Sequence, residues 1–171
     1  VKAMRKVINS SKLLVRVNPW GMWSEKEINE VVEAGADMIM LPYFSSIDEV
    51  VSFLSHVDAR AKTCLLLETL NAINILDDLL VIPGIDFVHI GLNDIHIERR
   101  TTFMFEFLAD GGVDQIAKKL RKVNVPFGFG GIARIGTLVP KAECILAEHF
   151  RLGSTGVILS RSFCHPSQAN G

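Results

Sequence analysis

Four short runs of nearly continuous apolar residues mark the first half of the chain. They occupy residues 13–17, 38–41, 64–67 and 87–90. Runs of this length without a polar face are typical of strands buried on both sides of a parallel sheet. We therefore predict four parallel strands in this half of the chain.

Segments with helical periodicity lie between these runs. Ser24 followed by Glu27, and Ser46 followed by Glu49, are capping-box signatures that predict the first turns of two helices. A third helix is expected to begin at Asn71. The regular alternation of strand and helix predicts βαβ units and a parallel sheet.

The second half continues the alternation with a looser rhythm. After a longer loop we expect a short segment at 103–108, a helix at 113–123, a strand at 126–130, a helix at 140–150 and a strand at 154–159. The total is then six strands. Because a complete eight-fold barrel needs about 250 residues, we expect a (β/α)8 TIM-type barrel of which this chain supplies about six strands, with the N-terminal βα units missing.

Residues 1–164 are expected to form this single partial barrel domain, and residues 165–171 a polar C-terminal tail. The alternative architecture is an open, six-stranded, doubly wound sheet.

Four residues at the ends of the first four strands are evenly spaced. They are Arg16, Pro42, Glu68 and Asp94, and the interval from each to the next is the same. In parallel β/α folds the working face lies at the carboxyl ends of the strands. We therefore expect Glu68 and Asp94 at the same depth on consecutive strands, with Arg16 nearby.

These side-chain types suit a metal and an anionic substrate. Carboxylates are hard oxygen ligands of the kind that Mg²⁺ or Mn²⁺ prefers, and Arg16 can bind a substrate carboxylate with two parallel hydrogen bonds. The alternative is that Arg16, Glu68 and Asp94 form a structural ion-pair cluster.

Composition narrows the class of protein. The chain has 18 Lys and Arg against 19 Asp and Glu, a net charge of −1, so we expect no nucleic-acid partner. Its three cysteines have no CxxC spacing, which argues against zinc and redox motifs. No apolar run is long enough to span a bilayer. We expect a cytoplasmic protein without a membrane partner, and a homo-oligomer in which open sheet edges are covered.

Several motifs together resemble a known family. They are LVRVN at 14–18, AGAD at 34–37 followed by MLP at 40–42, LET at 67–69, and PGID at 83–86 with GLND at 91–94. In this order and at these intervals they resemble the citrate lyase β-chain and metal-dependent 2-keto-acid aldolase family, part of the phosphoenolpyruvate/pyruvate-binding barrel superfamily. The resemblance runs from about residue 13 to residue 159.

The resemblance implies roles for particular residues. Glu68 and Asp94 would bind Mg²⁺ or Mn²⁺, and Arg16 would be the catalytic residue that binds the carboxylate or the enolate oxygen of the substrate. The expected substrate-binding residues are Arg16, Pro42, Gly91, Leu92, Asn93 and Arg134. Arg134 lies just beyond a predicted strand, and a salt bridge at the rim is the other interpretation of it.

The implied activity is a divalent-metal-dependent carbon–carbon lyase or aldolase of class II type, which acts through a pyruvate enolate on a small 2-keto acid. Two alternatives remain: a phosphoenolpyruvate-using transferase or hydrolase on the same site, and a non-catalytic barrel fragment with a role in assembly or ligand sensing. Many aldolases of the family have Gly-Pro where this chain has Gly91-Leu92, and they use a histidine from an early strand that has no counterpart here. We therefore assign no general base.

Overall fold

The computed structural model describes residues 1–136 and 140–163 of the chain. Six parallel strands form one sheet, and their order in space is their order in the sequence. The strands are β1 (Leu14–Arg16), β2 (Met38–Leu41), β3 (Lys62–Leu67), β4 (Phe87–Ile90), β5 (Phe127–Ile132) and β6 (Gly156–Leu159). The expected domain end at residue 164 and the tail at 165–171 lie outside the described residues.

Helices connect the strands. They are α1 (Lys2–Val7), α2 (Ser24–Glu33), α3 (Ile47–Val57), α4 (Leu70–Asn74), α5 (Leu76–Leu79), α6 (Leu92–Arg99), α7 (Glu106–Ala109), α8 (Gly112–Lys122), α9 (Ala142–Leu152) and the 3-10 turn η1 (Arg161–Phe163). Within the described ranges, no helix combines the length and the hydropathy needed to cross a bilayer.

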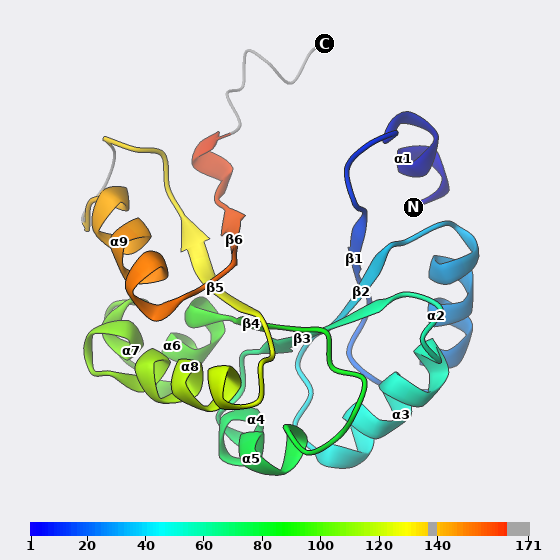
Figure 1. Ribbon diagram of the computed structural model, residues 1–171, viewed down its shortest axis with the longest axis horizontal. Coiled ribbons are helices and arrows are strands. Elements are labelled where there is room, and N and C mark those ends of the chain that lie inside the picture. The colour runs from blue at the N-terminus through cyan, green and yellow to red at the C-terminus, as the bar shows by residue number, and fades with distance from the viewer. Residues whose placement is uncertain (137–139, 164–171) are drawn as a thin grey trace.

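The sheet curls into a half-barrel. In Figure 1 helices α2 to α9 lie along its outer, convex side, and the edge strands β1 and β6 face each other across the open side. A doubly wound sheet would carry helices on both faces and would reverse its strand order at one point, so that alternative is wrong. The predicted partial (β/α) barrel is confirmed, with six parallel strands.

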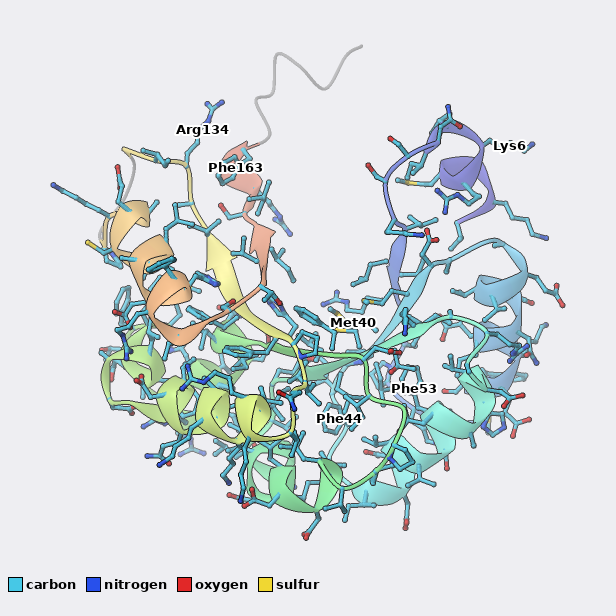
Figure 2. All side chains as sticks on the ribbon, in the orientation of Figure 1. Lys6, Met40, Phe44, Phe53, Arg134 and Phe163 are labelled. Carbon is cyan, nitrogen blue, oxygen red and sulfur yellow. The ribbon has the colours of Figure 1, made fainter. Side chains whose placement is uncertain are left out.

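Strands β2, β3 and β4 are largely buried on both faces, as their apolar runs predicted, whereas the edge strand β1 exposes Leu14 and Arg16 and does not meet the same prediction. Between the sheet and the outer helices, side chains such as Phe44 and Phe53 are 1% and 0% exposed (Figure 2). On the inner face a smaller cluster packs together, and Met40 points into the concave side in Figure 2. That inner cluster consists of Met40, Cys64 and Leu66, with Met38 and Phe87 packed against them.

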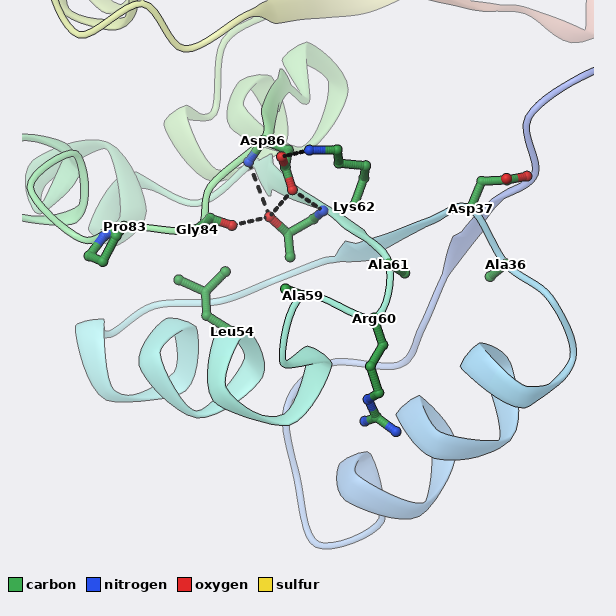
Figure 3. Close-up of a pocket in the computed structure, with 11 residues that line it drawn as sticks. Ala36, Asp37, Leu54, Ala59, Arg60, Ala61, Lys62, Pro83, Gly84 and Asp86 are labelled. Carbon is green, nitrogen blue, oxygen red and sulfur yellow. Dashed lines mark hydrogen bonds and ion pairs between the residues drawn. The ribbon is translucent and has the colours of Figure 1, made fainter.

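Two aspartates tie neighbouring strands together at their amino ends. Asp37 Oδ2 accepts the Leu13 amide at 2.8 Å and an Arg5 guanidinium nitrogen at 2.7 Å. These donors hold the pKa of Asp37 at about 2. Asp86 accepts the Thr63 amide at 2.9 Å in the same way, next to its ion pair with a lysine (Figure 3). Each carboxylate thus satisfies an amide at the start of the preceding strand.

One of the two predicted capping boxes is confirmed. Ser46 Oγ accepts the Glu49 amide, and the Glu49 carboxylate accepts the Ser46 amide. The box predicted at Ser24 is wrong: Ser24 is already inside α2, and its hydroxyl instead accepts the amide of Gly21 in the preceding turn. A serine hydroxyl near the start of a helix can bond to any of several nearby backbone groups, and the local path of the chain decides which one is within reach.

The third helix begins earlier than predicted. Thr69 Oγ1 accepts the Ala72 amide and caps α4, so Asn71 lies within the helix and does not cap it. The segment then divides into α4 and α5 at Ile75.

The even spacing of the four residues at the strand ends does not correspond to the register of the strands. Arg16 pairs with Met40, two residues before Pro42. Leu67 pairs with Ile90, so Glu68 is level with Gly91 and not with Asp94. The expectation that the two carboxylates lie at the same depth on consecutive strands is therefore wrong.

The longer loop expected after Asp94 is wrong in its first part. Helix α6 extends to Arg99 and carries Asp94 in its first turn. The strand and the helix are joined by Gly91 alone, which leaves no room for a longer connection.

Candidate active site

A small pocket of about 150 Å³ opens at the carboxyl ends of the strands. Strands β1, β3, β4, β5 and β6, the start of α6 and the loop before α7 all contribute to it. Its lining residues are Arg16, Leu66, Glu68, His89, Gly91, Leu92, Asn93, Asp94, Met104, Gly130, Gly131 and Ile158. Parallel strands of a barrel direct their carboxyl ends to one face, which is where such folds bind ligands.

Glu68 is the buried acid of this pocket. It follows β3 directly, is only 2% exposed, and accepts the Tyr43 amide at its Oε1 with an N–O distance of 3.0 Å. Burial raises the pKa of Glu68 to about 7, and the neighbouring Asp94 carboxylate raises it too, whereas the Tyr43 amide and the Arg16 guanidinium lower it. An acid in such surroundings is stabilised by a positive charge next to it.

Asp94 reaches the same pocket from a helix. Because Gly91 alone separates β4 from α6, the first turn of α6 lies directly above the strand end. Asp94 Oδ1 accepts the phenol of Tyr43 at 2.5 Å. This bond is the main reason that the pKa of Tyr43 rises to about 12. The carboxylate pair predicted from the sequence is thus assembled, although by a different route.

Arg16 faces the two acids from β1. It pairs with Met40 on β2, which in turn pairs with Cys64 on β3, so Glu68 lies beyond the level of Arg16. The long guanidinium side chain lines the pocket nonetheless, and its charge lowers the pKa of both Glu68 and Tyr43. One cation and two carboxylates therefore share the site.

The start of α6 adds backbone donors. Among the described residues, no side chain caps this helix at Gly91. The first amides of a helix have no partner within the helix and carry partial positive charge. Leu92 and Asn93 line the pocket at this point, so the positive end of α6 lies beside it.

Not every predicted site residue lies here. Pro42 is buried directly after β2, and Arg134 lies two residues beyond β5. Neither is among the residues that line this pocket. Figure 2 shows Arg134 far from Met40, at the rim of the half-barrel. Their predicted roles in substrate binding stay predictions.

His89 also lines the site, although its position within the predicted strand at residues 87–90 did not indicate this. It lies on the inner face of β4, is 4% exposed, and donates from Nε2 to the Gly130 carbonyl at 3.2 Å. Burial lowers the pKa of His89 to about 4, so the ring is neutral at pH 7. Its place beside Glu68 depends on the pairing of β3 and β4, which no sequence motif indicated.

The described residues contain no group of three or more His, Cys, Asp or Glu side chains suited to a metal ion. Glu68 and Asp94 bring two carboxylates to one pocket. A two-carboxylate site is typical of Mg²⁺, which keeps several waters and binds through substrate oxygens as well. The donor set of this pocket therefore fits such an ion.

An apolar pocket of about 250 Å³ adjoins the site, and Met104 and Gly131 line both. A third pocket, drawn in Figure 3, lies at the amino ends of the strands and holds the Lys62–Asp86 ion pair at 2.6 Å. The hydrogen bonds and ion pairs of this pocket hold neighbouring strands together, and residues at the amino ends of barrel strands typically serve stability.

Solved structures share this fold. A HpcH/HpaI aldolase/citrate lyase family protein from Burkholderia cenocepacia J2315 has a TM-score of 0.75 at 11% identity, over 93% of this chain and 70% of that one. A HpcH/HpaI aldolase from Desulfitobacterium hafniense DCB-2 has a TM-score of 0.70 at 14% identity, over 87% and 65%. A citrate lyase from Burkholderia xenovorans LB400 has a TM-score of 0.74 at 14% identity, over 98% and 60%.

Comparison by sequence gives no such result: no family model and no curated protein matches the chain. The chain spans between 60% and 70% of the three solved structures. Citrate synthase SbnG and macrophomate synthase also share the fold. The chain therefore has the fold of the phosphoenolpyruvate/pyruvate-binding barrels, the superfamily that its motifs resemble.

Proposed function

We propose that this chain belongs to the aldolase/citrate lyase family and forms the site of a divalent-metal-dependent carbon–carbon lyase or aldolase that acts through a pyruvate enolate. The observation that carries the proposal is the meeting of Glu68, Asp94 and Arg16 in one pocket at the carboxyl ends of the strands. The shared fold of the aldolase and citrate lyase structures supports it.

Glu68 and Asp94 would hold the metal ion. Burial is the main cause of the raised pKa of Glu68, and the nearby Asp94 carboxylate raises it further; a divalent cation bound to both carboxylates would offset both effects. Mg²⁺ or Mn²⁺ suits oxygen ligands of this kind. When bound, the ion would act as a Lewis acid toward the keto oxygen of the substrate.

Arg16 and the start of α6 would bind the substrate carboxylate. A guanidinium offers two parallel donors to a carboxylate, and Leu92 and Asn93 at the start of α6 line the same pocket. The small volume of about 150 Å³ favours a compact group such as pyruvate. These contacts would fix the orientation of the keto acid in the pocket.

The reaction that fits this site is the cleavage of a 4-hydroxy-2-keto acid. The bond between C3 and C4 breaks, and its electron pair forms the enolate across C3, C2 and the keto oxygen. The C4 hydroxyl loses its proton and becomes an aldehyde, while C3 takes up a proton to give pyruvate. Arg16 would hold the substrate carboxylate throughout, and the neutral His89 in the same pocket adds no charge that would compete for the anion.

Exchange of the methyl hydrogens of pyruvate with deuterium tests the proposal directly. In D₂O with Mn²⁺ the wild-type protein is expected to exchange them, and Glu68→Gln is expected to lose both exchange and Mn²⁺ binding. Glu98→Gln is the matched control, because Glu98 is an exposed carboxylate outside the pocket that also accepts a backbone amide, that of Leu70 at 2.8 Å.

Three results would contradict the proposal: no exchange with full Mn²⁺ occupancy, no Mn²⁺ binding at all, or equal exchange by Glu68→Gln. Phosphate release from phosphoenolpyruvate without methyl exchange would favour the transferase or hydrolase alternative instead.

A further inference from the structure

Tyr43 is bonded to both acids of the candidate site. Its backbone amide donates to Glu68 Oε1 at 3.0 Å, and its phenol donates to Asp94 Oδ1 at 2.5 Å. These two carboxylates belong to different elements: Glu68 follows β3, and Asp94 lies in the first turn of α6. One residue from the loop after β2 thus connects them.

The backbone of Tyr43 is in a conformation that most side chains avoid. Its φ angle is +50°, in the left-handed region. This region is sterically unfavourable for a residue with a Cβ atom, and such residues cluster at functional sites. In this left-handed conformation the amide of Tyr43 reaches Glu68 and its ring reaches Asp94.

Packing does not explain this placement. Tyr43 is 51% exposed, whereas its neighbour Phe44 is only 1% exposed and belongs to the core. A residue that buried its ring for stability would lie as Phe44 does. Tyr43 instead donates two hydrogen bonds to carboxylates, one from its amide and one from its phenol.

We propose that Tyr43 is a positioning residue that fixes Glu68 and Asp94 relative to each other for divalent-cation binding. The inference rests on the proposed function, since it concerns the same ion. Side chains that bond to metal-ligating carboxylates keep the ligand oxygens oriented, and loss of such a partner typically weakens metal binding by about 10-fold to 100-fold. Asp94 needs this support because it reaches the pocket from a helix and not from the sheet.

The test is the affinity for Mn²⁺ alone, measured by calorimetric titration. Tyr43→Phe removes the phenol oxygen and keeps the backbone amide that bonds to Glu68. We expect its dissociation constant for Mn²⁺ to rise by about 10-fold or more with an unchanged melting temperature. Tyr43→Gly also removes the ring but is suited to the positive φ, so it is expected to weaken Mn²⁺ binding without lowering the melting temperature.

Thr102→Val is the matched control. It also removes a bond between a hydroxyl and a carboxylate, from Thr102 Oγ1 to Glu106 Oε1 at 2.9 Å, while two backbone amides keep their bonds to that oxygen. Neither residue lines the candidate site. The control is expected to bind Mn²⁺ as the wild type does.

A spectroscopic readout is specific to this residue. Tyr43 is the only tyrosine of the chain, so a tyrosine band in the near-ultraviolet difference spectrum on addition of Mn²⁺ belongs to it. We expect that band in the wild type and its absence in Tyr43→Phe.

The outcomes separate the two proposals. Wild-type and Tyr43→Phe proteins with equal Mn²⁺ affinity, or tighter binding by the variant, would overturn the positioning role and leave the metal site intact. A wild-type protein that binds no Mn²⁺ would overturn both. A Tyr43→Phe protein with a melting temperature far below that of the wild type would indicate a structural role. The positioning role would still hold if Tyr43→Gly kept the wild-type melting temperature and bound Mn²⁺ more weakly than the wild type.

Discussion

Gly91 lies so close to Glu68 that a side chain at residue 91 would collide with it. A Cβ atom added to Gly91 would lie 2.7 Å from the Cβ of Glu68 and 3.1 Å from its Oε2. Glu68 and Gly91 lie level with each other directly after β3 and β4, since Leu67 pairs with Ile90, and this explains the close approach. Glycine at this position is what allows α6 to begin above the buried acid.

Gly91→Ala is therefore expected to disturb the site. The added methyl group forces β4 or Glu68 to shift, at a cost of about 1–3 kcal/mol in the free energy of unfolding, and Mn²⁺ binding should weaken. Urea unfolding and Mn²⁺ titration measure the two effects. Gly21→Ala is the control, because a Cβ there meets nothing nearer than 3.8 Å; an equal loss in both variants would count against the close-approach explanation.

In the metal-free protein, the stability of Glu68→Gln relative to the wild type is expected to increase as the pH rises. The folded-state pKa of Glu68 is about 7, above the ordinary value of 4.5. A raised carboxyl pKa contributes stability that is fully present below pH 4.5 and is lost as the pH rises through 7. Glutamine does not titrate, so the variant should gain stability relative to the wild type between these pH values.

Thermal melts in a chelating buffer at pH 4.5 and pH 8 measure this difference, with Glu98→Gln as the control. A variant that is less stable than the wild type at pH 8 by the same margin as at pH 4.5 would show that the buried charge of Glu68 carries no penalty.

His89 is expected to make the protein sensitive to acid. Its pKa is about 4 in the folded protein, below the ordinary value of 6.5. The unfolded chain therefore binds a proton first, and the stability that is present above pH 6.5 is lost as the pH falls toward 4. The loss is on the order of 3 kcal/mol.

The measurement is urea unfolding at several pH values between 6.5 and 4, for the wild type and for His89→Gln. The variant is expected to be less stable at pH 7 and to show a shallower decline with falling pH. Parallel declines in the two proteins would place the acid sensitivity elsewhere, for instance at His149, whose pKa burial also lowers.

Phe53→Ala should destabilise the fold without touching the site. Phe53 is 0% exposed between α3 and the outer face of the sheet, so its removal leaves a cavity at a cost of about 3–5 kcal/mol. Phe150→Ala is the matched control, because Phe150 is 91% exposed on α9 and should change stability by less than about 0.5 kcal/mol. Denaturant unfolding of both variants tests the assignment of the core; similar losses would contradict it.

Sequence patterns gave correct predictions for features that depend on the burial of a short segment or on interactions between residues close together in the chain. The apolar runs predicted the buried strands β2, β3 and β4, and Ser46 with Glu49 predicted a capping box that the structure contains. Predictions of helix caps failed where more than one nearby group could form the capping hydrogen bond. Ser24 bonds to a nearby turn amide instead of capping α2, and Thr69 caps α4 where Asn71 was expected.

The even spacing of Glu68 and Asp94 led to a correct grouping for a wrong reason. Sequence intervals count residues along the chain, whereas the depth of a side chain depends on the register of hydrogen-bonded strands. Because Ile90 at the end of β4 pairs with Leu67, Asp94 passes beyond the strand and into α6. It reaches the pocket because the helix starts directly after Gly91.

The sequence by itself determined the class of fold and the chemistry available to it: buried parallel strands, two carboxylates and an arginine near strand ends. Only the tertiary structure decided how these groups meet. It placed the amide and the phenol of Tyr43 on the two acids, set the neutral His89 in the same pocket, and kept Arg134 outside it. These relations depend on strand register and on one left-handed backbone turn, both of which long-range packing selects and no local pattern encodes.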